Sequence, residues 1–128
     1  MVWQRNISRT ELASEYARCD VFCLPSIQEG FGIVFLEAMA SGKPIVAVRA
    51  GAAPEVVAHG LLVKPEDDEE LAAAIERLYR EPSLRASLGS AGKTFVRTFD
   101  ASVVGKAFMR EIESCAGFHA EAEFPPRR

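Results

Sequence analysis

The sequence predicts an α/β fold: a partial doubly wound, Rossmann-like parallel sheet of three to four strands with flanking helices. Short apolar runs alternate with longer segments of helical composition. Strands that alternate with helices need crossover connections, which give a parallel sheet with helices on both faces. The runs V-F-C-L, I-V-A-V and L-L-V show no polar alternation, as is typical of strands buried on both faces. We therefore expect about half of a doubly wound domain.

Most of the expected sheet comes from the first half of the chain. The expected strands are residues 2–6, 21–25, 45–48 and 61–63. The expected helices between them are residues 9–19, 32–42 and 55–58. Ser8 and Glu11 have the spacing of a capping box at the first helix. Gly42 is suited to end the second helix, and Pro54 suits the first turn of the third.

The second half of the chain is expected to be helical. Pro65 and the acidic run 66–70 suit a helix start, because negative charge there complements the helix dipole. Leu71, Ile75 and Leu78 then form an apolar stripe. Two further helices are expected at 83–97 and 101–116, the first with a weak point at 89–92. We expect a single domain at 1–117, followed by a polar tail at 118–128.

Composition and charge exclude several classes of protein. The chain has 128 residues, with 15 basic and 18 acidic side chains and a net charge of −3. It lacks the basic excess of a nucleic-acid-binding protein, so we expect no nucleic-acid partner. No apolar run approaches the ~18 residues needed to cross a bilayer, and residues 1–6 do not resemble a signal peptide. We expect a cytoplasmic location.

The three cysteines, Cys19, Cys23 and Cys115, do not suggest a disulfide framework, since their number is odd. No pair of His or Cys residues lies near Cys19 and Cys23 to complete a zinc site. We expect all three cysteines to be small buried hydrophobes, and we expect no bound metal.

Residues 29–37, E-G-F-G-I-V-F-L-E, carry the clearest signs of chemistry. They follow an expected strand, and ligands of open parallel sheets bind at the carboxyl ends of the strands. Gly30 and Gly32 let the backbone approach a ligand closely. The free N–H groups at the start of the following helix form an anion site suited to phosphate. The alternative is a plain tight turn, because glycines before helices are common.

Glu37 lies on a helix that is apolar nearly all round and is therefore expected to be buried. A buried carboxylate needs polar partners, and no Lys or Arg lies within one helical turn of Glu37 in the sequence. The neighbouring hydroxyls of a ribose would satisfy both of its oxygens. The alternatives are that Glu37 reaches the surface or pairs with a distant arginine.

Glu29 lies just before the same helix, near its positive end. Its carboxylate is able to accept hydrogen bonds from a sugar or to stabilise positive charge at a sugar carbon. The alternative is that it only complements the helix dipole. His59 is expected to be a solvent-exposed loop residue rather than a catalytic base.

Together these residues resemble the signature of retaining GT-B glycosyltransferases, in which two glutamates have seven residues between them and G-F-G follows the first. The stretches D-V-F-C-L-P-S, E-A-M-A-S-G-K-P-I-V-A, P-E-V-V and G-L-L-V-K-P are similar to that family in order and spacing. The similarity covers about residues 1–115 and implies the C-terminal half of a GT-B nucleotide-binding domain. One departure is Gly51-Ala52 in place of a double glycine, which narrows backbone freedom beside the site.

The resemblance implies a role for each residue of the segment. Glu29 resembles the catalytic glutamate at the reactive face of the donor sugar. Glu37 resembles the glutamate that holds the ribose hydroxyls. The residues that the resemblance places on the sugar and diphosphate of the donor are Gly30, Phe31, Gly32, Ile33 and Val34.

The resemblance also implies a reaction and its partners. Such enzymes transfer a hexose from a nucleotide-diphosphate sugar to a carbohydrate or lipid-linked acceptor with retention of configuration, and generally need no metal or other cofactor. Their diphosphate-binding Arg and Lys and their acceptor-binding N-terminal domain lie upstream of the matched segment. We therefore expect this chain to need an upstream partner and to be inactive alone. Peripheral membrane association of the complete enzyme is compatible with the resemblance. The alternative is a non-catalytic module that binds a nucleotide sugar or a partner protein.

Overall fold

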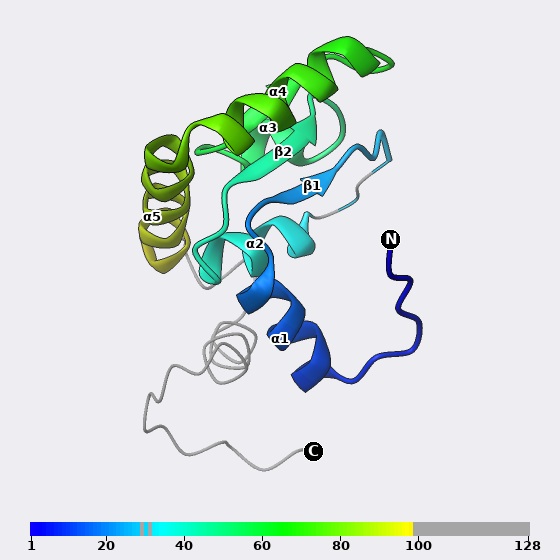
Figure 1. Cartoon of the computed structure of the whole chain (residues 1–128), viewed down its shortest axis with the longest axis vertical. Coiled ribbons are helices and arrows are strands. Elements are labelled where there is room, and N and C mark those ends of the chain that lie inside the picture. The colour runs from blue at the N-terminus through cyan, green and yellow to red at the C-terminus, as the bar shows by residue number, and fades with distance from the viewer. Residues whose placement is uncertain (29, 31, 99–128) are drawn as a thin grey trace.

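The computed structural model describes residues 1–28, 30 and 32–98. Helices and strands alternate along most of this length, as the sequence predicts (Figure 1). In chain order the elements are α1 (Arg9–Arg18), β1 (Phe22–Leu24), α2 (Ile33–Ala40), β2 (Ile45–Val48), α3 (Ala53–Val56), β3 (Leu61–Val63), α4 (Asp68–Arg80) and α5 (Pro82–Thr98).

The three strands form one parallel sheet in the order β1-β2-β3. Phe22 lies opposite Ile45, and Val46 lies opposite Leu61, so the strands run side by side in the same direction. The predicted parallel sheet is therefore confirmed. The loops that follow β1 and β2 leave the sheet at the same edge, its carboxyl edge.

The strand predicted at residues 2–6 is wrong. Within the described residues the sheet contains only β1, β2 and β3. Asn6 has a φ of 53°, a left-handed conformation that interrupts extended backbone. Val2 and Trp3 are 84% and 79% exposed, so no burial of apolar surface favours strand pairing there.

Side chains of β2 alternate between two hydrophobic clusters, one on each face of the sheet. Ile45 and Ala47 pack with side chains of α1, α2, α3 and the end of α5. Val46 and Val48 pack with side chains of β3, α4 and the start of α5. Figure 1 shows α4 on one side of the sheet and α1 and α2 on the other. Helices therefore cover both faces, as predicted.

β1 is less buried than the sequence predicts. Phe22 and Leu24 are half-buried and Cys23 is exposed, because within the described residues β1 pairs only with β2 and forms an edge of the sheet. The expectation that Cys23 is buried is wrong for the same reason. Cys19 is half-buried, and Cys115 lies outside the described residues.

Local signals set the first turns of the helices. The predicted capping box is present at α1, where the Glu11 amide donates to the Ser8 hydroxyl at 3.2 Å and the Ser8 amide donates to the Glu11 carboxylate at 2.6 Å. The third helix begins at Ala53 rather than at residue 55 as predicted, so that Pro54 lies inside its first turn, where proline is tolerated.

The predicted apolar stripe of α4 is only partly correct. Leu78 is fully buried and Leu71 is half-buried, but Ile75 is 41% exposed. Ala74 is buried in place of Ile75. It lies four residues before the buried Leu78, and residues four apart on a helix share a face. Ile75 is therefore rotated away from the sheet.

The weak point predicted at residues 89–92 is wrong, because α5 is continuous through both glycines. A Cβ on Gly89 would collide with the carbonyl oxygen of Gly42, and a Cβ on Gly92 would lie 3.0 Å from Cγ of Met39. The two glycines let α5 pack closely on the end of α2. The predicted helix at 101–116, the tail at 118–128 and the boundary between them lie outside the described residues.

Candidate functional site

The loops that follow β1 and β2 contact each other at the carboxyl edge of the sheet. A Cβ placed on Gly32, which follows β1, would lie 3.3 Å from Cγ2 of Val56 and 3.5 Å from Cβ of Ala52, both of which follow β2. The edge of a parallel sheet where the strands end is the usual ligand-binding edge of such folds. The sequence-predicted segment and the alanine-rich loop therefore adjoin at this edge.

Gly32 forms the N-cap of α2 in a conformation that favours glycine. Its φ is 68°, and a Cβ there would also lie 3.2 Å from Cδ2 of Phe35. The amides of Ile33 and Val34, in the first turn, have no acceptor within the helix. Ile33 is 43% exposed and Val34 is half-buried, and the first turn holds no acidic side chain. The start of α2 is therefore suited to an anion.

Glu37 lies one turn further along α2 and is half-buried. Its carboxylate Oε2 accepts a hydrogen bond of 2.8 Å from the hydroxyl of Tyr16 on α1. No ion pair joins Glu37 to a lysine or arginine within the described part of the chain. A neutral donor thus satisfies one position on the carboxylate, and no lysine or arginine among the described residues pairs with its charge.

Tyr16 contacts the candidate site through Glu37, and the sequence alone did not indicate this contact. Tyr16 is 8% exposed, and burial, followed by its hydrogen bond to Glu37, raises the pKa of its hydroxyl far above the ordinary value. The signal available in the sequence was weak: a tyrosine on the apolar face of a helix needs an acceptor for its hydroxyl, but the sequence does not reveal which acceptor.

Other predicted site residues differ in how far the structure describes them. Gly30 is exposed, and a Cβ there would meet nothing within 4 Å. Glu29 and Phe31 lie outside the described residues.

Ala52 has φ −77° and ψ −13°, a right-handed conformation open to any residue, while Gly51 carries the positive φ of 54°. Alanine in place of the second glycine therefore causes no backbone strain.

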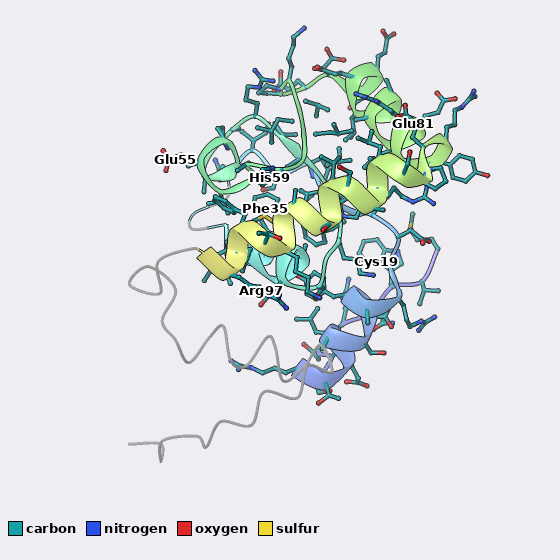
Figure 2. All side chains as sticks on the ribbon, turned by 90° about the vertical axis from the view of Figure 1, so that its left-hand side faces the viewer. Cys19, Phe35, Glu55, His59, Glu81 and Arg97 are labelled. Carbon is teal, nitrogen blue, oxygen red and sulfur yellow. The ribbon has the colours of Figure 1, made fainter. Side chains whose placement is uncertain are left out.

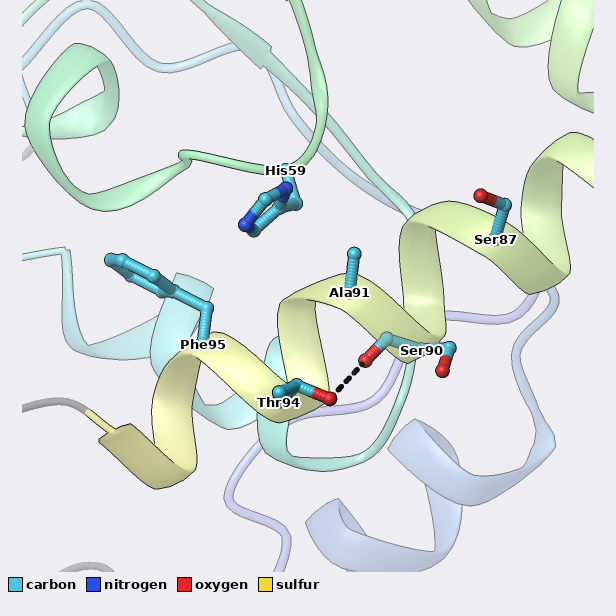
Figure 3. Close-up of a pocket in the computed structure, with 6 residues that line it drawn as sticks. All are labelled: His59, Ser87, Ser90, Ala91, Thr94 and Phe95. Atoms are coloured by element: carbon cyan, nitrogen blue, oxygen red, sulfur yellow. Dashed lines mark hydrogen bonds between the residues drawn. The ribbon is translucent and has the colours of Figure 1, made fainter.

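A hollow of about 540 Å³ lies away from these residues, between the loop before β3 and α5 (Figure 3). Its loop residue, His59, precedes β3 and so lies toward the amino edge of the sheet. The His59 ring is half-buried and meets the Phe95 ring nearly edge to face at 5.8 Å, so the expectation of a solvent-exposed loop histidine is only partly correct. This hollow does not include the segment that resembles a donor site.

The described residues show neither a cluster suited to a metal ion nor a helix suited to crossing a membrane. No group of three or more His, Cys, Asp or Glu side chains is arranged to hold a metal ion among residues 1–28, 30 and 32–98. Within the same ranges, no helix combines the length and apolar character needed to cross a membrane.

Comparison with known proteins identifies a family for most of the chain. Residues 1–95 match the family described as "Glycosyl transferases group 1". The chain is 47% identical over 91 residues to the MMP alpha-(1->4)-mannosyltransferase of Mycolicibacterium hassiacum, a match that covers 68% of this chain and 22% of that protein. It is 34% identical over 105 residues to a sulfoquinovosyl transferase of Arabidopsis thaliana, covering 77% of this chain and 21% of that protein.

Solved structures agree with this similarity. The sucrose-phosphate synthase of Thermosynechococcus elongatus has a TM-score of 0.67 and 33% identity, over 81% of this chain and 26% of that one. Anabaena HepE, solved in complex with UDP-glucose, has a TM-score of 0.65 and 31% identity, over 78% of this chain and 29% of that one. The chain therefore spans about a fifth of the curated relatives and about a quarter of the solved ones.

Proposed function

Since the chain belongs to the glycosyl transferases group 1 family, we propose that it supplies the donor-binding part of a glycosyltransferase that uses a nucleotide-diphosphate sugar. The proposed reaction transfers a hexose to an acceptor with retention of configuration. The observation that carries the proposal is the position of Glu37 one turn behind an open helix start, at the carboxyl edge of a parallel sheet. Because the phosphate and the ribose of a nucleotide are directly bonded neighbours, one helix is able to contact both.

The diphosphate is proposed to lie at the start of α2. The backbone N–H groups of Ile33 and Val34 point along the helix axis toward this end, where the helix dipole is positive. The absence of a side chain at Gly32 removes the steric barrier to a close approach. Phe31 and Gly30 complete the loop in this proposal. The helix dipole and protein cations, rather than a bound metal, then balance the charge of the leaving diphosphate.

The ribose is proposed to bind Glu37. Among the described residues Glu37 has no cationic partner, and a carboxylate in that state accepts strongly from two adjacent hydroxyls, because hydrogen bonds to a charged group are stronger than neutral ones. The half-buried position of Glu37 reduces competition from water. This explains why an acidic side chain occurs on a helix whose buried residues are all apolar, namely Phe35, Leu36, Ala38, Met39 and Ala40.

Glu29 is proposed as the catalytic glutamate. It precedes α2 in the chain, and it matches the first glutamate of the family signature. A carboxylate there would stabilise the positive charge that develops at the anomeric carbon, which is an interaction that is stronger in the transition state than in the ground state.

The upstream chain and an acceptor are the proposed partners. The outer edge of β1 has unpaired backbone groups within the described residues, and the relatives are four to five times longer than the matched segment. We expect further parallel strands to pair with β1, and a second domain to bind a carbohydrate or lipid-linked acceptor. This chain alone is then expected to bind the donor weakly and to be inactive.

Glu37→Ala tests the ribose assignment. The substitution should weaken binding of a nucleoside diphosphate by about 2–4 kcal/mol, because it removes charged hydrogen bonds. Isothermal titration calorimetry or NMR titration with UDP, GDP and ADP measures the dissociation constants. Glu55→Ala is the matched control, because Glu55 is exposed and points outward (Figure 2). Equal dissociation constants for wild type and Glu37→Ala would refute the ribose role.

Glu29→Gln tests the catalytic assignment, in a polypeptide that includes the upstream domain. Turnover should fall much more than donor affinity, because the charge acts mainly in the transition state. Steady-state kinetics compared with donor titration separates the two quantities. Equal losses in turnover and affinity would favour simple sugar binding by Glu29. Full affinity without turnover in the unmutated polypeptide would instead favour a non-catalytic binding module.

A further inference from the structure

We propose that Tyr16 is a positioning residue for Glu37, whose hydroxyl fixes the carboxylate so that its remaining lone pairs meet a vicinal diol. The inference rests on the proposed ribose role of Glu37 and adds to it a residue from a different helix. Tyr16 does not touch the nucleotide in this proposal. It acts through Glu37, the side chain that is proposed to contact the nucleotide.

The contact joins two elements that are far apart in sequence. The Tyr16 hydroxyl on α1 donates to Glu37 Oε2 on α2 at 2.8 Å, across 21 positions of the chain. Without this hydrogen bond, the Glu37 side chain is able to rotate about its Cβ–Cγ and Cγ–Cδ bonds. A hydrogen bond from a fixed donor restricts them before a ligand arrives, which lowers the entropic cost of binding.

The Tyr16 ring is itself held by its neighbours. Its centroid lies 5.6 Å from that of Phe22 on β1, and Phe22 meets Phe35 on α2 edge to face at 6.2 Å. Phe35 is fully buried and lies two residues before Glu37. The three rings therefore connect α1, β1 and α2, and they fix the donor hydroxyl relative to the helix that carries its acceptor.

The direction of the hydrogen bond is also fixed. Burial and the neighbouring carboxylate both raise the pKa of Tyr16, so the hydroxyl stays protonated at physiological pH and acts as the donor. An ionised carboxylate has about four lone-pair positions on its two oxygens. Tyr16 occupies one of them, which leaves Oε1 and the free position on Oε2 for the two hydroxyls of a diol.

A purely structural role is the competing explanation. A buried tyrosine hydroxyl needs an acceptor, and Glu37 would then serve Tyr16 rather than the reverse. A structural role predicts that loss of the hydroxyl changes stability without changing which nucleotides bind. A positioning role predicts that it changes the preference for nucleotides with a vicinal diol.

The experiment measures that preference in the 128-residue chain. UDP, GDP and ADP are titrated by NMR, each beside its 2′,3′-dideoxy counterpart, and the ratio of dissociation constants (dideoxy over ribose form) is the readout. Wild type should favour the ribose form of the base that binds. Tyr16→Phe should lower this ratio about three- to tenfold, the equivalent of one lost hydrogen bond, with the affinity for the dideoxy form unchanged.

Matched variants make the result specific. Tyr79→Phe is the control, because it removes the same hydroxyl from a tyrosine that is 80% exposed, and it should leave the ratio unchanged. In a Glu37→Gln background, Tyr16→Phe should have no further effect on the ratio, because the two residues act through one contact. Tyr16→Phe keeps the ring that packs on Phe22, and water is able to replace the lost donor at the half-buried Glu37, so the single variant is expected to fold.

The possible failures are distinguishable. If Glu37→Gln abolishes the preference but Tyr16→Phe preserves it, the positioning role is overturned and the ribose role stands. If Tyr16→Phe has the same effect in the Glu37→Gln background as in wild type, the hydroxyl acts elsewhere and the positioning role is again overturned. If wild type shows no preference for the ribose form, or no binding at millimolar nucleotide, the ribose role fails and the positioning role fails with it.

Discussion

Gly89 of α5 lies directly against the carbonyl oxygen of Gly42, at the end of α2. A backbone oxygen cannot rotate away as a side chain can, so this contact fixes how closely the two helices approach. Because α2 also carries Gly32 at its start and Glu37 one turn later, the packing of α5 helps to determine where the candidate donor site lies relative to the sheet.

Gly89→Ala should therefore destabilise the chain by about 1–3 kcal/mol through overpacking. This is the net loss, after the ~1 kcal/mol that alanine gains over glycine inside a helix has offset part of the cost of overpacking. Urea unfolding followed by circular dichroism measures the change. Gly92→Ala is a useful contrast, since its Cβ would meet the flexible side chain of Met39 at 3.0 Å, which is able to shift. An unchanged stability for Gly89→Ala would show that the helices separate at little cost.

Gly32→Ala should also be destabilising, by about 1–2 kcal/mol, because alanine is strained in the left-handed region. The added methyl would lie 3.2 Å from Cδ2 of Phe35 and 3.3 Å from Cγ2 of Val56. Gly30→Ala is the matched control, since a Cβ there meets nothing within 4 Å, and its thermal midpoint should stay close to that of wild type. Equal midpoints for both variants would contradict the cap geometry of α2.

Asp67→Ala should cost about 1 kcal/mol, because it removes an N-cap. The Asp67 carboxylate accepts from the Glu70 amide at 2.8 Å, and the Glu70 carboxylate in turn accepts from the Lys64 amide at 2.7 Å. Asp68→Ala removes a charge from the same turn without removing the cap, and it should cost only a few tenths of a kcal/mol through the helix dipole. Chemical unfolding of both variants tests the difference.

Local patterns were sufficient to predict much of the fold. The run at 45–48 is apolar on every residue, and it forms β2 with all four residues buried. The cap pair Ser8 and Glu11 correctly placed the start of α1. By contrast, the apolar residues near Val2 did not make a strand, because a strand needs a partner and the local sequence does not say whether one is present.

The contacts that define the candidate site could be predicted less well. The hydrogen bond between Tyr16 and Glu37 joins two helices through tertiary packing, and no spacing rule within one element applies to it. The same holds for Gly89 and Gly42, where glycines that weaken an isolated helix instead allow close helix packing. Sequence reasoning selected Glu37 and the start of α2 as candidates for a binding site, but the partner of the Glu37 side chain, Tyr16, depends on the folded arrangement.

Tyr16 finally predicts a pH dependence of stability. Folding raises the pKa of its hydroxyl, so the folded chain keeps a proton that the unfolded chain loses near the ordinary value of about 10. The stability that this retained proton contributes is fully present below pH ~10. Above pH ~10 the free energy of unfolding should fall by ~1.4 kcal/mol per pH unit, because one proton is lost on unfolding. Tyr16→Phe lacks the ionisable group and should lose less stability between pH 9 and about 11, whereas Tyr79→Phe, altered at an exposed tyrosine, should follow wild type. Urea unfolding at several pH values gives the three slopes, and parallel slopes for wild type and Tyr16→Phe would mean that the Tyr16 hydroxyl is not buried against Glu37 in solution.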